Sequence, residues 1–147
     1  MSAQYDIARD APPGMAWIEG RTFRMGSDHH YPEEAPAHRV SVDGFWIDAT
    51  PVTNAQFAAF VEATGHVTFA EIAPNADHYP GALPEMLVPA SVVFVPPPQR
   101  VDLRDHYQWW QFLAGADWRH PQGPHSSIGS KDDHPVVHVA ARGAAAD

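Results

Sequence analysis

Histidine is a common metal ligand, and it is abundant in this chain: ten of the 147 residues are histidines. On a helix, the four-residue spacing of His134 and His138 would place both imidazoles on one face. Pro135 and the two valines after it predict an extended chain instead, in which four residues span roughly 13 Å. That distance is too great for two ligands of one ion, and the adjacent His29 and His30 point to opposite sides of an extended chain. We therefore expect structural or solvent-facing histidines and no metal ion held by this chain.

Catalytic acids, bases and nucleophiles give no stronger signal. The chain contains the residue types of a serine hydrolase site in Ser126, His120 and Asp117. No GxSxG motif surrounds the serine, however. The paired carboxylates Glu33-Glu34 and Asp132-Asp133 lie in stretches of loop composition, where ordinary solvation accounts for them. Metalloprotease, EF-hand, Walker and dinucleotide-binding patterns are absent from the sequence. Residue chemistry alone therefore predicts no catalytic residue.

Charge and cysteine content exclude several classes of function. The 18 acidic and 9 basic residues give a formal net charge of -9, which would repel a nucleic-acid backbone. The chain has no cysteine, so disulfides, thiolate nucleophiles and Cys-ligated metals are excluded. No apolar run approaches the ~20 residues of a membrane span, and the N-terminus has no signal-peptide core. We expect a cytoplasmic protein that binds neither nucleic acid nor membrane.

Proline content limits the regular structure. The chain has 15 prolines, about twice the usual share of about 5%. Each proline fixes one backbone torsion and removes a hydrogen-bond donor, so long helices and long central strands are disfavoured. The 5 Trp, 4 Tyr and 7 Phe provide apolar area for a core. The sequence predicts one loop-rich α+β domain.

Alternation and turn residues predict two hairpins near the N-terminus. Residues 15–18 and 22–26 are the strands of the first, joined at Glu19-Gly20-Arg21. Residues 38–42 and 45–48 are the strands of the second, because Asp43-Gly44 is a strong hairpin turn. The residues between the hairpins, 27–38, have no periodicity and predict an exposed loop.

The clearest helix signal covers residues 53–64. Thr53 is a suitable N-cap, Gln56 completes a capping box, and Val52 is placed to staple onto Phe57. Gly65 supplies the left-handed residue that ends a helix. The apolar positions fall on one face, formed by Phe57, Phe60 and Val61.

The remaining elements are shorter. Residues 91–95 predict a strand, residues 96–98 a stiff polyproline bridge, and residues 133–139 end in a second, β-branched strand. Residues 105–113 place three large apolar side chains together, and we expect these to pack under a loop: Trp109, Trp110 and Leu113.

Five segments in order resemble the formylglycine-generating enzyme (sulfatase-modifying factor) family. Residues 17–26 (WIEGRTFRMG) are similar to its opening hairpin, and 34–42 (EAPAHRVSV) to the strand that follows. Residues 45–57 (FWIDATPVTNAQF) resemble its helix start, although Pro51 stands where the family usually has an acid. The most specific matches are residues 117–124 (DWRHPQGP) and 133–139 (DHPVVHV).

The resemblance implies a fold and an activity. The fold is an α+β, loop-rich variant of the C-type lectin fold with short hairpins and few helices. Its boundaries would be a flexible lead-in at 1–14, an incomplete domain at 15–139 and a tail at 140–147. Aerobic members oxidise a cysteine in a sulfatase motif to Cα-formylglycine, a post-translational modification that uses oxygen and copper held by two cysteines. Complete members usually bind calcium as well.

The chain departs from the family in its chemistry. The resemblance places the catalytic cysteines and the calcium segments in a second half of the domain, and this chain has no cysteine. We therefore expect a truncated domain that is inactive alone, with no catalytic residue and no cofactor of its own. The resemblance assigns loop-closing or peptide-groove roles to five residues: Trp118, Arg119, His120, His134 and His138.

An alternative is a non-catalytic module on the same scaffold, which would bind a peptide or another protein. Its partners would be a sulfatase-type peptide, a complementing subunit or a second copy of the chain. If the second half of the family's domain packs on Phe45, Trp46, Trp109, Trp110 and Trp118, the truncated chain is expected to expose an apolar patch or to self-associate. A relative of the ergothioneine-type sulfoxide synthases would need a histidine-rich iron site, which the histidine spacing does not favour.

Overall fold

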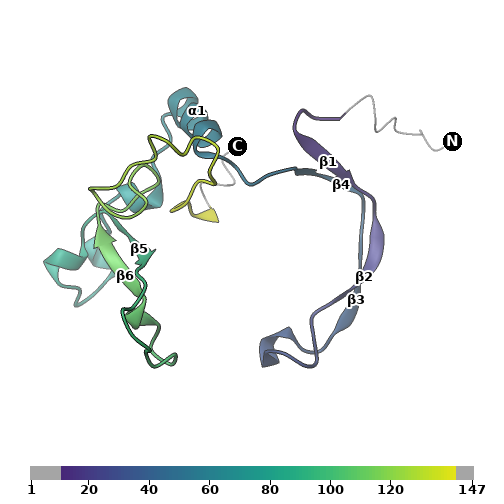
Figure 1. Cartoon of the computed structure of the whole chain (residues 1–147), viewed down its shortest axis with the longest axis horizontal. Helices are drawn as coiled ribbons and strands as arrows, with labels where there is room; N and C mark the ends of the chain where they lie inside the picture. The colour runs from purple at the N-terminus through teal and green to yellow at the C-terminus, as the bar shows by residue number, and fades with distance from the viewer. Residues whose placement is uncertain (1–10, 142–147) are drawn as a thin grey trace. The chain divides into compact units, whose positions relative to one another are not determined.

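The computed structural model describes residues 11–141, which form two compact units that divide between Thr50 and Pro51. Figure 1 shows the elements of both units, coloured in chain order. The expected lead-in at 1–14 and tail at 140–147 fall largely on residues 1–10 and 142–147, outside the described residues. Among the described residues, none of the helices combines the length and the apolar character that crossing a membrane requires.

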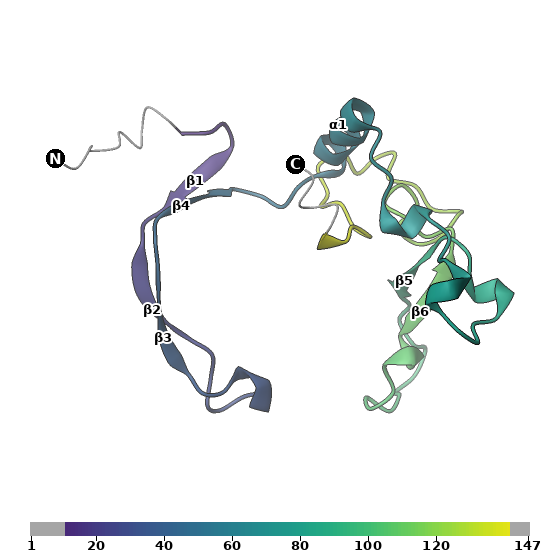
Figure 2. The same ribbon diagram turned by 180° about the vertical axis from the view of Figure 1, so that it is seen from behind.

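The first unit is a long antiparallel ribbon. Its strands are β1 (Met15–Ile18), β2 (Arg21–Met25), β3 (His38–Val42) and β4 (Phe45–Asp48). The predicted strands are confirmed, but their predicted pairing is wrong. β1 pairs with β4 and β2 pairs with β3, so β1 and β2 lie along one arm of the ribbon and β3 and β4 along the other (Figures 1 and 2).

Two glycines explain why the hairpin signals were misleading. Gly20 and Gly44 face each other where the two pairs of strands meet, and a Cβ on Gly20 would come within 2.7 Å of the Gly44 nitrogen. A Cβ on Gly44 would come within 2.3 Å of the Trp17 ring. Both positions therefore need glycine for close approach of the two arms, and neither serves as a hairpin turn.

The chain reverses at residues 26–37, one residue earlier than the exposed loop predicted at 27–38. The loop contains the short 3-10 helix η1 (Pro32–Glu34) and is closed by a hydrogen bond from Ser27 N to Glu34 O at 3.2 Å. The Asp28 carboxylate accepts from Ala37 N at 2.9 Å and from the Arg24 guanidinium at 3.1 Å. The prediction of an exposed loop is confirmed, and its internal bonds make it an ordered turn.

The ribbon has no core of its own. None of its described residues is buried, and its large apolar side chains are about half exposed: Met15, Phe23, Met25, Phe45 and Ile47. Trp17 and Trp46 form a cross-strand edge-to-face pair with ring centroids 5.3 Å apart. A two-stranded ribbon is marginally stable in water, so this unit needs a covering surface to be stable.

The second unit begins with helix α1 (Asn54–Thr64), and its predicted capping box and glycine end are confirmed. Thr53 Oγ1 accepts from Gln56 N at 3.3 Å, while Gln56 Oε1 accepts from Thr53 N at 2.8 Å, which is the capping box. Gly65 ends the helix with φ of 68°.

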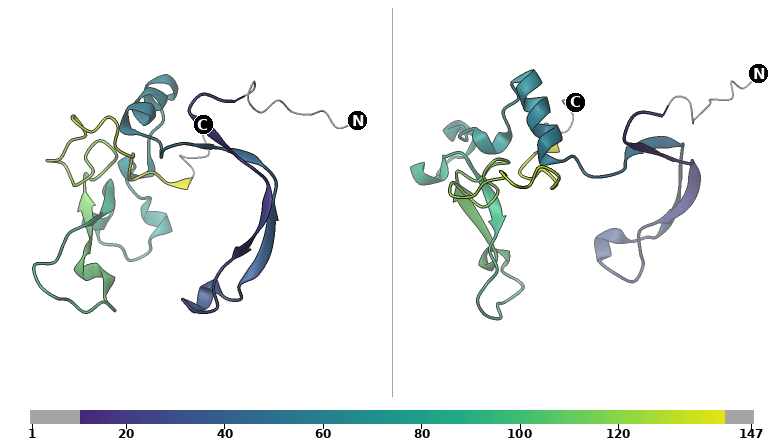
Figure 3. Two further views of the ribbon diagram at one scale, coloured as in Figure 1. Left: turned by 45° about the vertical axis from the view of Figure 1, so that its right-hand side comes forward. Right: turned by 45° about the horizontal axis from the view of Figure 1, so that its top comes forward.

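A two-stranded sheet of β5 (Ala90–Phe94) and β6 (Trp110–Ala114) lies in the same unit, as Figure 3 shows. The predicted strand at 91–95 is confirmed to within one residue. Residues 110–114 form a strand and are not packed under a loop, so that prediction was wrong. The connecting segments contain four short 3-10 helices: η2 (Phe69–Glu71), η3 (Ala76–His78), η4 (Pro84–Met86) and η5 (His106–Gln108).

The core of the second unit is small. Its buried side chains come from α1, η2, β5 and the loop after β6: Asn54, Phe57, Thr68, Ala70, Val93, Ala116 and Trp118. Phe57 lies against Trp118, so the core joins the helix to the 117–124 segment.

Candidate functional site

Trp118, in the most specific of the sequence segments, is a core residue. Its side chain is 2% exposed, and its ring meets that of Phe57 edge to face, with centroids 5.1 Å apart. The Arg119 guanidinium carbon lies 4.1 Å from the centroid of the Trp118 ring and covers it. Trp118 therefore does not contribute to an exposed apolar patch, which corrects its place among the expected patch residues.

Arg119 ties this segment to the 3-10 helix η2. Its Nη1 atom lies 2.7 Å from Glu71 Oε1. The other Glu71 oxygen accepts from the Thr68 backbone N–H at 2.9 Å and from the Thr68 hydroxyl at 2.7 Å. Glu71 therefore connects two segments that are 48 residues apart in the chain.

Replacing Glu71 by alanine is expected to destabilise the second unit more than replacing Arg119 by lysine. Glu71→Ala leaves both Thr68 donors unpaired at a buried position, which costs about 2 kcal/mol. Arg119→Lys keeps a charge near Glu71, and because the ion pair is partly exposed we expect a loss of at most about 1 kcal/mol. Urea denaturation followed by circular dichroism measures both. Equal losses would contradict this account of Glu71.

His120 and Asp117 form a pair within a tight turn. One Asp117 carboxylate oxygen accepts from Arg119 N at 2.7 Å and His120 N at 2.8 Å, and lies 3.1 Å from His120 Nδ1. Ser126 does not complete a catalytic triad, because its hydroxyl donates to Gly123 O at 2.7 Å and accepts from Gln122 N at 2.9 Å. The histidine and carboxylate have a structural arrangement without a nucleophile.

The 131–136 segment binds the N-terminus of α1. Asn54 N donates to His134 O at 2.9 Å, and Ala55 N donates to Asp132 O at 3.0 Å. The Asn54 side chain adds a bond from Nδ2 to Lys131 O at 2.8 Å. Helix N-terminal N–H groups have no partner within the helix, so this segment satisfies them. Sequence reasoning missed Asn54; its one signal was a polar residue directly after the Thr53 cap.

His138 fixes the end of the same segment. The predicted strand at the end of 133–139 was wrong, because the segment forms only an isolated bridge at Pro135 and then turns at His138, whose φ is 61°. His138 Nε2 donates to Pro121 O at 2.9 Å, since a carbonyl only accepts. Its Nδ1 atom lies 2.8 Å from the Ser91 hydroxyl, so His138 links the segment to β5.

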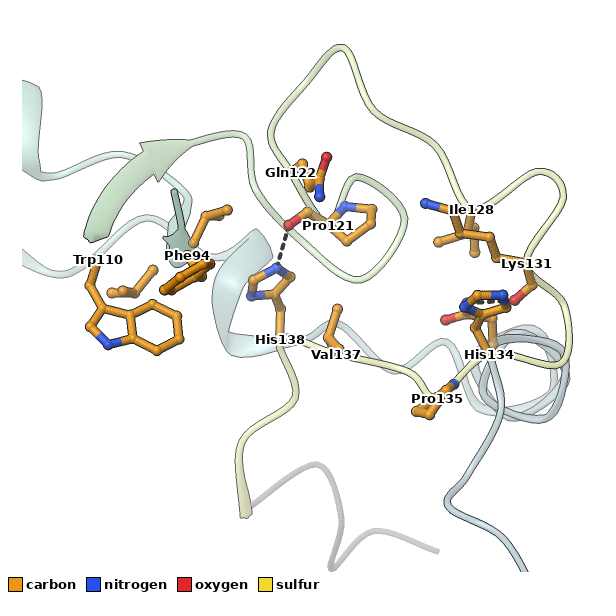
Figure 4. Close-up of a pocket in the computed structure, with 13 residues that line it drawn as sticks. Phe94, Trp110, Pro121, Gln122, Ile128, Lys131, His134, Pro135, Val137 and His138 are labelled. Carbon is orange, nitrogen blue, oxygen red and sulfur yellow. Dashed lines mark hydrogen bonds between the residues drawn. The ribbon is translucent and has the colours of Figure 1, made fainter. Parts of the chain in front are cut away.

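His134 and His138 both line a cavity of about 490 Å³, which we call the histidine-lined cavity (Figure 4). Figure 4 shows Phe94 and Trp110 at one end, His138 near Pro121 and Val137, and His134 with Lys131 at the other end. The full lining is Asn54, Val92, Val93, Phe94, Trp110, Pro121, Gln122, Ile128, Lys131, His134, Pro135, Val137 and His138. Trp118, Arg119 and His120 do not line it.

A second candidate surface is one face of the β5–β6 sheet. Four side chains that alternate along the strands share this exposed sheet face and are each 40% to 54% exposed: Val92, Phe94, Trp110 and Phe112. The Phe94 and Trp110 rings are paired across the strands, with centroids 5.5 Å apart. Cavities of about 650 and 290 Å³ adjoin Phe112. Such a face is typical of a surface that binds another polypeptide.

The residues present do not fit the copper that the resemblance implies. Within residues 11–141, no three His, Cys, Asp or Glu side chains are grouped to hold a metal ion, and the whole chain has no thiolate donor for copper.

Hydrogen bonds from Arg104 hold the pKa of Asp102 below its usual value, and the same contact raises the pKa of Arg104. That exposed pair lies in the β5–β6 connection and lines none of the three cavities.

Comparison with known proteins gives a family match over nearly the whole chain. The family described as sulfatase-modifying factor enzyme 1-like domain matches residues 3–146. The formylglycine-generating enzyme of Mycobacterium tuberculosis is 52% identical over 123 residues, which are 84% of this chain and 41% of that protein. The mouse formylglycine-generating enzyme is 39% identical over 132 residues, 86% of this chain and 32% of that protein.

A relative named as inactive also matches. The mouse protein named inactive C-alpha-formylglycine-generating enzyme 2 is 36% identical over 132 residues, 87% of this chain and 39% of that protein. The chain therefore spans between about a third and less than half of the length of these curated relatives.

Proposed function

Because this chain belongs to the family of sulfatase-modifying factor enzyme 1-like domains, we propose that it binds a sulfatase-type peptide without oxidising it. The resemblance implies a reaction that needs copper on two thiolates, and the chain contains no cysteine. This absence is the observation that carries the proposal. The similarity to a relative named as inactive is compatible with binding in the absence of chemistry.

The exposed sheet face supports peptide binding. An extended peptide can add to an exposed sheet edge through main-chain hydrogen bonds, with its alternate side chains in pockets on the adjoining face. Phe112 borders both a 290 Å³ and a 650 Å³ cavity, and Trp110 borders the larger one. These aromatic side chains would supply the apolar contacts, and binding energy at such surfaces is concentrated in a few aromatic residues.

A protein partner is a second candidate, favoured by the ribbon of the first unit, which has no core of its own. Within the ribbon itself, Phe23, Met25, Phe45 and Ile47 stay half exposed. A polypeptide that provides two thiolates, or a second copy of the chain, would cover such side chains. In either case we propose that the fold is part of the lectin-like variant, and that copper and calcium would require residues outside this chain.

Phe112→Ala is expected to weaken binding of a CxPxR-type peptide at least 10-fold, because Phe112 borders both cavities beside the exposed sheet face. Fluorescence anisotropy of a labelled peptide measures the Kd. Tyr31→Ala is the matched control, since Tyr31 is an exposed aromatic residue in the other unit. Equal Kd values for F112A and the unchanged chain would refute the assignment of this face.

The same peptide tests the absence of chemistry. The purified chain, incubated with the peptide, copper, oxygen and a reductant, is expected to give no formylglycine by mass spectrometry. Formation of formylglycine at a rate that scales with the concentration of the chain would overturn the proposal. Binding with no product would support it.

A further inference from the structure

The histidine-lined cavity differs in charge from the rest of the molecule. The chain has a net charge of -9, yet none of the 13 residues that line this cavity is Asp or Glu. Lys131 provides a cation, and His134 and Gln122 provide further polar groups. An acid-free cavity in an acidic protein concentrates anions relative to the surrounding surface.

The polar groups of this cavity divide into those already bonded and those available. Both ring nitrogens of His138 have partners, so His138 acts as a wall of the cavity. The Lys131 ammonium, the His134 ring and the Gln122 side chain have no hydrogen bond or ion pair with any of residues 11–141. An ammonium and an amide N–H are donors, and charge-assisted bonds to a carboxylate are the strongest that they form.

The other walls are apolar and aromatic. Phe94 and Trp110 close one end, while Ile128 and Val137 line the remainder. The volume of about 490 Å³ lies within the range of small-molecule sites, roughly 300–1,000 Å³. Apolar walls with a few convergent donors are the usual composition of such sites.

We propose that the histidine-lined cavity binds a small aromatic carboxylate, with its ring between Trp110 and Val137 and its carboxylate at Lys131. The peptide test remains separate from this inference through Phe112, which does not line this cavity. Val92, Phe94 and Trp110 belong both to the exposed sheet face and to the cavity lining, so a bound carboxylate would also alter that face.

Isothermal titration calorimetry with 2-naphthoate tests the proposal on the full chain. Lys131→Met is expected to weaken binding at least 10-fold, since it removes the charge while the bond from Asn54 Nδ2 to the backbone oxygen of Lys131 can persist. Arg104→Met is the matched control, because Arg104 is an exposed basic residue that does not line the cavity, and it should leave the Kd unchanged.

A measurement that needs no variant compares ligands. The neutral 2-naphthamide should bind the unchanged chain at least 10-fold more weakly than 2-naphthoate, and inorganic phosphate should not compete. Equal affinities for the acid and the amide, equal effects of K131M and R104M, or the absence of naphthoate binding would each overturn the proposal. Competition by phosphate would show a general anion site and would also refute it.

Discussion

Trp118→Ala is expected to lower the free energy of unfolding of the second unit by about 3–5 kcal/mol, the usual cost of removing a buried aromatic side chain. Trp118 is 2% exposed and packs on Phe57 from α1, while Arg119 covers its ring. Its loss would leave a cavity at the point where the helix, η2 and the 117–124 segment meet. Urea denaturation monitored by far-UV circular dichroism measures the change without depending on tryptophan fluorescence.

Two further substitutions make this test specific. The Trp118 indole Nε1 is buried without a partner among the described residues, so Trp118→Phe removes an unsatisfied donor and keeps most of the ring. We expect it to cost less than about 1.5 kcal/mol, since relief of the unpaired donor offsets part of the lost volume. Tyr107→Ala, at a side chain that is 75% exposed, should change stability by no more than about 0.5 kcal/mol. A loss for W118A as small as that for Y107A would refute the core role.

Asn54→Asp is expected to destabilise the second unit by about 3 kcal/mol, although the two side chains have nearly the same shape. Asn54 is 3% exposed, and its Nδ2 atom donates to Lys131 O at 2.8 Å. A carboxylate there has no proton to donate and faces a carbonyl oxygen at a buried position, which is a costly arrangement. A negative charge in the first turn of a helix contributes only about 0.3–1 kcal/mol in the opposite direction.

The order of two variants provides the control. Asn54→Ala removes one donor to Lys131 O, which still accepts from His134 N at 3.1 Å. The loss of one hydrogen bond is therefore expected to cost about 1 kcal/mol, less than N54D. Thermal and urea unfolding of both variants at one pH establishes the order. If N54D is as stable as the unchanged chain, the carbonyl of Lys131 does not depend on this amide and the interpretation is wrong.

Local signals in the sequence predicted local structure well. The limits of α1 followed from Thr53, Gln56 and Gly65, because capping boxes and left-handed caps involve residues within a few positions of each other. The strand segments of the ribbon followed from alternation for the same reason. Their pairing did not, because Asp43-Gly44 has the composition of a turn while its position opposite Gly20 requires close backbone approach.

The site depends on contacts that have no local signature. His134 and His138 were candidates from their segment, but their shared cavity also needs Phe94 and Trp110 from the β5–β6 sheet. The extended geometry expected for 133–139 failed at His138, whose left-handed backbone is uncommon for a residue other than glycine. Two hydrogen bonds of its ring support that conformation, to partners 17 and 47 residues away.

The bond from Asn54 to Lys131 also has a consequence for the order of folding during synthesis. The two residues are 77 positions apart, and at roughly 5–20 residues per second a ribosome needs roughly 4–15 s to add that length. An isolated helix of 11 residues is marginal in water. Through that interval α1 would leave the ribosome with its first turn unpaired and Phe57 uncovered, which makes the nascent chain a substrate for chaperones until residue 136 emerges.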